Sequence, residues 1–208
     1  MLFSWDQTYN VELENQASDP SDTGTVWFSD SAAPERILAY ILSQELPPET
    51  SFLDLGTGNG EMLFLLQEEG GFNGTMLGVD YSASSIELAK RIAETKGLTK
   101  ELTFEAWDVL EDIVRPSAFD VVLDKGTFDA VSLSGQEGVE ERYVRKVELL
   151  VRKAGLVLIT SCNWTEKELR SWFESGSLEC HGRIDYPVFR FGGQTGQSIS
   201  SVCLRKRQ

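Results

Sequence analysis

The sequence contains one histidine and three cysteines, and this scarcity limits the kinds of site it can hold. Cys162, Cys180 and Cys203 lie far apart and form no C-x-x-C pair. Because a zinc site is usually built from cysteine and histidine ligands, we expect no metal site. An odd number of cysteines, without a secretory signal in the first residues, favours reduced thiols and a cytoplasmic protein.

Long apolar runs and positive charge are also lacking. No apolar run approaches the roughly 20 residues of a membrane-spanning helix, so we expect no membrane partner. The sequence has 19 Lys and Arg against 33 Asp and Glu, a net charge of −14. Such a surface repels phosphate backbones, so we expect no direct nucleic-acid binding. It suits a basic protein partner, although acidity that merely aids solubility is the commoner explanation.

The length of 208 residues and the 41% hydrophobic content are typical of a single domain with a sizeable core, and we expect a monomer. Residues 15–24 are rich in Ser, Asp, Pro and Gly and predict a loop. We therefore divide the domain into residues 1–30, a segment expected to close over the site, and residues 31–208, an α/β core.

Within the core, short apolar runs typical of strands alternate with helical spacing of apolar residues. Strands are predicted at 51–55, 75–79, 102–105, 119–123 and 156–160. Helices are predicted from Pro34 to before Pro47, at 60–69, 84–96 and 139–151, and after a capping box formed by Thr165 and Glu168. Residues 178–188 and 199–205, joined by the glycine-rich F-G-G-Q-T-G-Q, predict an antiparallel pair. Because such alternation implies parallel strands with right-handed crossovers, we predict a Rossmann-like, seven-stranded, mostly parallel sheet. It should have helices on both faces and a C-terminal antiparallel hairpin.

The first motif is D-L-G-T-G-N-G at residues 54–60, between an apolar stretch and a helical one. Its glycines allow a tight turn and a close approach of a ligand to the backbone. A dinucleotide fingerprint needs a glycine where Glu61 stands, so no pyrophosphate is implied. Asp54 suits a cationic ligand end instead, such as the amino group or sulfonium side of S-adenosylmethionine. A plain strand-to-helix turn is the alternative for this motif taken alone.

Two further acids follow the next two strands. Asp80 ends the second strand, where a carboxylate can accept both ribose hydroxyls of a nucleoside. Asp108 follows the third strand and could accept the adenine amino group, with Trp107 or a neighbour packed on the ring; a core position is the alternative for Trp107. Since ligands of open α/β sheets bind at the carboxyl ends of the strands, Asp54, Asp80 and Asp108 should face one crevice.

The fourth motif, D-K-G-T-F-D-A at residues 124–130, follows the fourth strand. We expect the reacting groups to meet here, with Asp124 holding a substrate amine and Phe128 lining the acceptor channel. A surface pair of Lys125 and Asp129, which would contribute only about 0–1 kcal/mol, is the alternative for two of the charges.

These motifs, followed by S-C-N-W at residues 161–164, make the chain resemble class I methyltransferases. It is most similar to the eukaryotic lysine methyltransferases that modify translation elongation factor 1-alpha. The resemblance covers nearly the whole chain, and its departures, around Asp19 and at residues 68–71, lie away from the motifs.

The resemblance implies S-adenosylmethionine as cofactor, S-adenosylhomocysteine as product, and a basic protein substrate, elongation factor 1-alpha. It implies Asp124 and Phe128 as catalytic residues. The cofactor-binding residues that it implies are Asp54, Gly56, Thr57, Gly58, Gly60, Asp80, Tyr81, Trp107, Asp108 and Asp124.

We expect no dedicated base. Methyl transfer is an in-line displacement, and desolvation in a closed channel lowers the pKa of a substrate lysine. Three other functions remain open. A small-molecule methyltransferase would need a lid over its acceptor pocket, a nicotinamide-dependent oxidoreductase conflicts with Glu61, and a non-enzymatic module would not need all the cofactor-contacting residue types.

Overall fold

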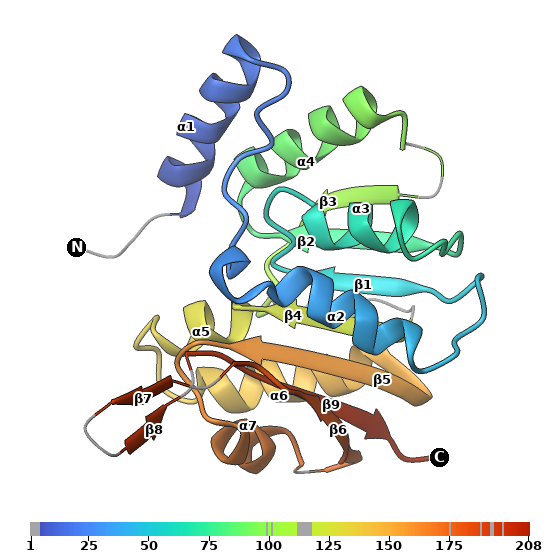
Figure 1. Ribbon diagram of the computed structural model, residues 1–208, viewed down its shortest axis with the longest axis vertical. Coiled ribbons are helices and arrows are strands. Elements are labelled where there is room, and N and C mark those ends of the chain that lie inside the picture. Colours follow the sequence, from blue (N-terminus) through green and yellow to red (C-terminus); the bar gives the residue numbers. More distant parts are fainter. Residues whose placement is uncertain are drawn as a thin grey trace.

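The computed structural model describes residues 5–98, 100, 102–111, 118–174, 176–187, 189–191, 194–196 and 198–208. Figure 1 shows one twisted sheet with helices on both faces. Its seven strands run in the order β3-β2-β1-β4-β5-β9-β6. Their bounds are β1 Phe52–Leu55, β2 Met76–Asp80, β3 Leu102–Ala106, β4 Phe119–Lys125, β5 Val151–Ser161, β6 Leu178–Ile184 and β9 Ser200–Lys206.

The helices form two layers, one on each face of the sheet. Their bounds are α1 Trp5–Ser18, α2 Ala33–Leu42, α3 Glu61–Glu68, α4 Ala83–Lys96, α5 Thr127–Ser132, α6 Val139–Leu150 and α7 Glu166–Phe173, with a 3-10 turn η1 at Ser29–Ser31. Apolar side chains of α2, α3 and α4 share one core with one face of the sheet. Those of α5, α6 and α7 share a second core with the other face. The molecule therefore has three layers, and the carboxyl ends of β1 to β5 meet at one edge.

The sheet topology confirms the predicted fold class. Strands β1 to β5 pair in parallel, as the strand–helix alternation predicted. Strand β9 then lies between β5 and β6 and is antiparallel to both, which is the predicted C-terminal pair. The capping box of Thr165 and Glu168 is also present at the start of α7.

Three elements differ from the prediction. Helix α1 continues through Ser18 into the predicted loop. It buries Tyr9, Glu12 and Gln16, and because two of these residues are polar, the sequence shows no apolar pattern for this helix. Helix α5 has only six residues, too few for a periodicity to be recognised. The glycine-rich link contains two short strands, β7 Phe189–Phe191 and β8 Gln194–Gly196, which form a separate hairpin.

Residues 188, 192, 193 and 197 of the predicted C-terminal pair and its link lie outside the described residues. Within the ranges that the structure describes, no helix has the length and apolar character needed to cross a bilayer.

Candidate active site

The glycine turn connects β1 to α3 and is built so closely that side chains do not fit in it. Gly56, Gly58 and Gly60 all have left-handed backbones, with φ of 64°, 57° and 84°. A Cβ on Gly56 would lie 2.1 Å from the hydroxyl oxygen of Thr127, and one on Gly58 would lie 2.6 Å from the hydroxyl oxygen of Tyr9. The predicted turn is therefore present, and neighbouring protein atoms already require two of its glycines.

Asp54 lies inside the protein at the base of this turn. One of its carboxylate oxygens accepts a hydrogen bond from the hydroxyl of Thr57, at 2.8 Å. Burial raises the pKa of Asp54 to about 6, while the Thr57 hydrogen bond and the charge of Lys125 oppose the rise. A cation that reached Asp54 would favour the ionised carboxylate and bind to it.

Asp80, at the end of β2, fastens the glycine turn to the second strand. One carboxylate oxygen accepts from the backbone amide of Gly58 at 3.1 Å, and the other from the amide of Ser82 at 3.0 Å. Burial raises the pKa of this carboxyl, against the lowering effect of those two amides. The next residue, Tyr81, is 51% exposed and stands at the rim of the site.

The two predicted residues after β3, Trp107 and Asp108, differ in burial: the first is buried and the second is exposed. The backbone amide of Trp107 donates to the carbonyl oxygen of Asp80 at 2.8 Å, which continues the pairing of β3 with β2. The Trp107 side chain is buried in the second core, so the structure places it in the alternative position rather than on an open surface. Asp108 is exposed and accepts a hydrogen bond from the amide of Leu110 at 2.9 Å.

Strand register brings the three predicted acids to one edge of the sheet. Leu55 pairs with Val79, and Asp80 pairs with Ala106, so β1, β2 and β3 end side by side. Asp54 and Asp80 interact electrostatically, each making proton loss from its neighbour less favourable. Acidic groups therefore lie at the carboxyl ends of three neighbouring strands, and the ligand crevice that they were expected to face stays a prediction.

Asp124 occupies a different position from the predicted one. It is buried in β4, and its carboxylate accepts from the backbone amides of Thr127 and Phe128 and, at 2.7 Å, from the hydroxyl of Tyr143. Burial raises its pKa to about 7, although these three donors oppose the rise. All these contacts lie inside the protein, and through them Asp124 holds the start of α5.

Phe128 differs from its predicted position in the same way. Its side chain is 0% exposed, since the aromatic rings of Tyr143, Trp164, Trp172 and Phe173 surround it at centroid distances of 5.0–6.2 Å. A ring enclosed in the core has no surface for a substrate, because every face already contacts another side chain. Phe128 therefore supports the loop after β4 from below.

Asp129 connects this loop to the one that follows β5. Its carboxylate accepts hydrogen bonds from the hydroxyl of Ser161 and, at 2.9 Å, from the backbone amide of Cys162. The ammonium of Lys125 donates instead to the carbonyl oxygen of Trp27, at 3.1 Å. The alternative of a surface pair between these two charges is therefore wrong, because each has a partner from another segment.

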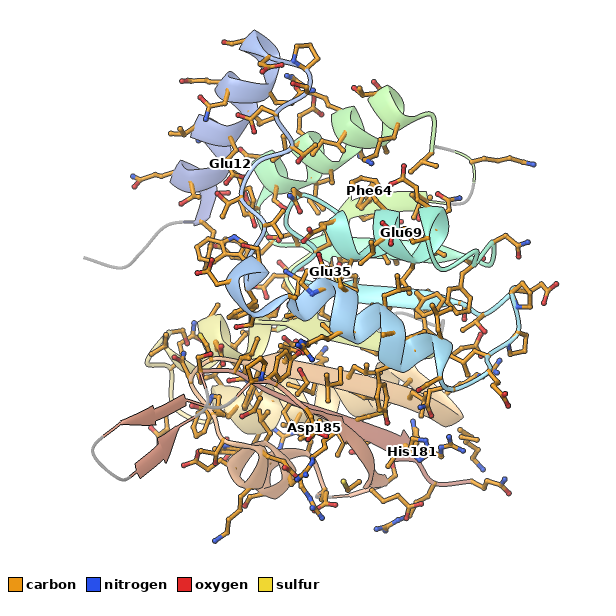
Figure 2. The ribbon with its side chains drawn as sticks, in the orientation of Figure 1. Glu12, Glu35, Phe64, Glu69, His181 and Asp185 are labelled. Atoms are coloured by element: carbon orange, nitrogen blue, oxygen red, sulfur yellow. The ribbon has the colours of Figure 1, made fainter. Side chains whose placement is uncertain are left out.

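The N-terminal segment, residues 5–28, lies over the glycine turn (Figure 1). Tyr9 brings its hydroxyl against Gly58, as described above, and the side-chain amide of Asn59 donates to the carbonyl oxygen of Thr23 at 2.8 Å. Figure 2 shows Glu12 beside the part of the segment that returns from α1, and its carboxylate accepts from the amide of Thr25 at 3.0 Å. Several contacts therefore hold the N-terminal segment against the glycine turn.

From the sequence, the N-terminal aromatics Trp5, Tyr9, Trp27 and Phe28 could either close over the cofactor or pack under the loop. The available signal was the spacing of Trp5 and Tyr9, four residues apart, which places both rings on one face of a helix. They stack with centroids 6.4 Å apart.

A groove of about 970 Å³ opens beside the carboxyl end of β5. Residues 161–165, one side of α7 and residues 198–200 line it. It carries charges of both signs, with Glu166 and Glu174 beside Lys167 and Arg170. The edge of the sheet at which Asp54, Asp80 and Asp108 lie is called the carboxylate edge. The groove is separate from it, because β4 and its loop lie between them.

Comparison with known proteins gives several curated relatives that match nearly the full chain. A family model described as "Methyltransferase domain" matches residues 46–193. Protein-lysine N-methyltransferase EFM4 of Saccharomyces cerevisiae is 42% identical over 98% of this chain and 92% of its own length. EEF1A lysine methyltransferase 2 of Homo sapiens is 37% identical over 97% of this chain and 84% of its own length.

Solved structures support the fold. An S-adenosylmethionine-dependent methyltransferase of Clostridium acetobutylicum superposes with a TM-score of 0.68 at 11% identity, covering 96% of this chain and 99% of its own. Magnesium protoporphyrin IX methyltransferase of Synechocystis, solved with bound SAM, gives 0.66 at 12% identity, covering 99% of both chains.

Proposed function

This chain belongs to the same methyltransferase family as EFM4 and EEF1A lysine methyltransferase 2, and we propose that it methylates a lysine of elongation factor 1-alpha, with S-adenosylmethionine as the methyl donor. The observation that carries the proposal is the 42% identity to the yeast protein-lysine N-methyltransferase across 98% of this chain. The net charge of −14 supports a basic protein substrate, because opposite charges favour their encounter.

The donor groups at the carboxylate edge fit this cofactor. Asp80 has the position and the free lone pairs to accept ribose hydroxyls, and exposed Asp108 can accept the adenine amino group. Asp54 is a buried carboxylate suited to the cationic amino-acid end. The turn of Gly56, Thr57, Gly58 and Gly60 would border the cofactor, with Tyr81 at the rim. Buried Trp107 would support the adenine pocket from beneath.

When bound, S-adenosylmethionine supplies a methyl group on a positively charged sulfur. The chain's own residues align the substrate amine with that methyl group, an effect that can contribute about 7–11 kcal/mol. The segment of residues 5–28 would exclude water by covering the turn, and a dry channel lowers the pKa of the substrate lysine. Asp124 contributes indirectly, since its hydrogen bonds fix the loop that borders the amine. The β5 groove is suited to the protein segment around that lysine, because Asp129 joins its wall to this loop.

Affinity for a cationic ligand should rise with pH because Asp54 must ionise to bind it. With a pKa of about 6, about a quarter of Asp54 is ionised at pH 5.5 and nearly all at pH 7.5. We therefore expect S-adenosylhomocysteine, which carries an ammonium group, to bind about fourfold more tightly at pH 7.5. Calorimetric titration at both values measures this, and Asp54→Asn should lose most of the difference. An unchanged pH dependence in Asp54→Asn would argue against the assignment.

The proposed activity is tested by incubating the purified chain with purified elongation factor 1-alpha and methyl-labelled S-adenosylmethionine. We expect label on a lysine-containing peptide of the factor, identified by mass spectrometry. Asp80→Ala should abolish transfer. Asp185→Ala should not, because Asp185 is an exposed acid away from the carboxylate edge (Figure 2). Label on a small molecule of a cell extract, with none on the factor, would contradict the proposed substrate.

A further inference from the structure

Lys125 is a half-buried cation at the acidic edge of the sheet that the reaction described above does not use. It is the last residue of β4, directly after Asp124, whose backbone pairs with Leu55 of β1. Successive strand residues point to opposite faces, so Lys125 lies on the face opposite Asp124, the face that carries α2 to α4. Its ammonium reaches the carbonyl oxygen of Trp27 and lies 5.8 Å from the ring centre of Phe28.

The surroundings of Lys125 are acidic. Burial lowers its pKa, and the charges of Glu61, Asp54 and Asp124 act against that effect. A lysine held among carboxylates and under the N-terminal segment costs free energy of desolvation. The carbonyl oxygen of Trp27 uses one of its three donors, so the ammonium can still bind a second acceptor.

The amino-acid end of the proposed cofactor carries two opposite charges on adjacent atoms, an ammonium and a carboxylate. Asp54 is suited to the ammonium but would repel the carboxylate. A cation close to Asp54 would offset that repulsion and could bind the carboxylate. Lys125 and Asp54 stand on neighbouring strands and interact electrostatically, and so form a pair of opposite charges that matches the ligand's own.

We propose that Lys125 binds the α-carboxylate of the cofactor's amino-acid end, while Asp54 binds its α-ammonium. This inference rests on the proposed function, since it assumes that the carboxylate edge binds S-adenosylmethionine. The N-terminal segment, residues 5–28, would then also position the Lys125 side chain, through Trp27 and Phe28.

The test compares two ligands that differ only in the group concerned: S-adenosylhomocysteine and its decarboxylated amine analogue. Calorimetric titration of the unsubstituted protein should show at least about tenfold tighter binding of S-adenosylhomocysteine, as expected for a charge-assisted hydrogen bond. Lys125→Met should weaken binding of S-adenosylhomocysteine about 10- to 100-fold and leave binding of the amine within about twofold. Lys125→Arg keeps the cation and should retain most of the affinity. Lys90→Met, on the exposed side of α4, is the matched control and should change neither.

Equal affinity of the unsubstituted protein for the two ligands would overturn the proposal, even if a variant failed to fold. Equal losses for both ligands in Lys125→Met would also overturn it and assign Lys125 a structural role through Trp27. If the unsubstituted protein bound neither ligand, the proposed function itself would fail.

Discussion

Asp124→Ala is expected to lower the free energy of unfolding by about 3–5 kcal/mol at pH 5.5. The substitution leaves the hydroxyl of Tyr143 and the amides of Thr127 and Phe128 buried without their acceptor. Each unsatisfied group costs about 1–3 kcal/mol. A loss of this size is a large share of the roughly 5–15 kcal/mol that stabilises a typical domain. Urea denaturation measures it, with Asp185→Ala as the control because Asp185 is exposed.

The same substitution should destabilise the protein less at high pH. The pKa of Asp124 is about 7 in the folded state against an ordinary value of 3.8. The folded state therefore holds the proton more tightly. The stability that protonated Asp124 contributes is fully present below about pH 4 and is lost as the pH rises through about 7. Between pH 5.5 and pH 8 this difference amounts to about 2 kcal/mol, by which the effect of Asp124→Ala should shrink. An equal effect at both values would show that Asp124 ionises normally.

Asp80→Ala is expected to weaken binding of S-adenosylhomocysteine by a factor of about 100 or more. Two ribose hydroxyls bonded to one carboxylate contribute about 1.5–3 kcal/mol each. The substitution also frees the amide of Gly58 and so loosens the turn. Calorimetry measures the affinity, and a thermal melt of the same sample shows whether the variant is folded.

Asp80→Asn separates the two contributions. Its amide oxygen can still accept from a backbone amide, but it lacks the negative charge. We expect an affinity between those of the unsubstituted protein and Asp80→Ala. A folded Asp80→Ala that bound S-adenosylhomocysteine normally would show that the ribose is held elsewhere.

The fold and the location of the site could be predicted because they depend on local pattern. Apolar strands alternating with amphipathic helices determine a parallel sheet, and parallel strands bring their carboxyl ends to one edge. Asp54, Asp80 and Asp108 each lie within two residues of the end of such a strand, so strand position alone placed them at one edge. The capping box of α7 could be predicted for the same reason, because Thr165 and Glu168 lie only three residues apart.

The direction of individual side chains could not be predicted in the same way. In a strand, a shift of one residue reverses the face, and nothing in D-K-G-T-F-D-A shows which face of the sheet Asp124 and Lys125 each take. The hydroxyl of Tyr143, nineteen residues away, binds Asp124 and places it on the face of the sheet that carries α5 to α7. The contact of Tyr9 with Gly58 could not be predicted for a related reason, because it joins segments 49 residues apart. Helix α1, which carries Tyr9, buries mainly polar residues and so gives no apolar pattern that would reveal it.

The central claim is that the carboxylate edge binds a positively charged nucleoside. Its most direct test is calorimetric titration of the unsubstituted protein with S-adenosylhomocysteine and, separately, with NADH. We predict saturable one-to-one binding of S-adenosylhomocysteine and no binding of NADH, because Asp54 repels a pyrophosphate and Glu61 replaces the glycine of a dinucleotide site. Binding of NADH with no heat from S-adenosylhomocysteine would contradict the account.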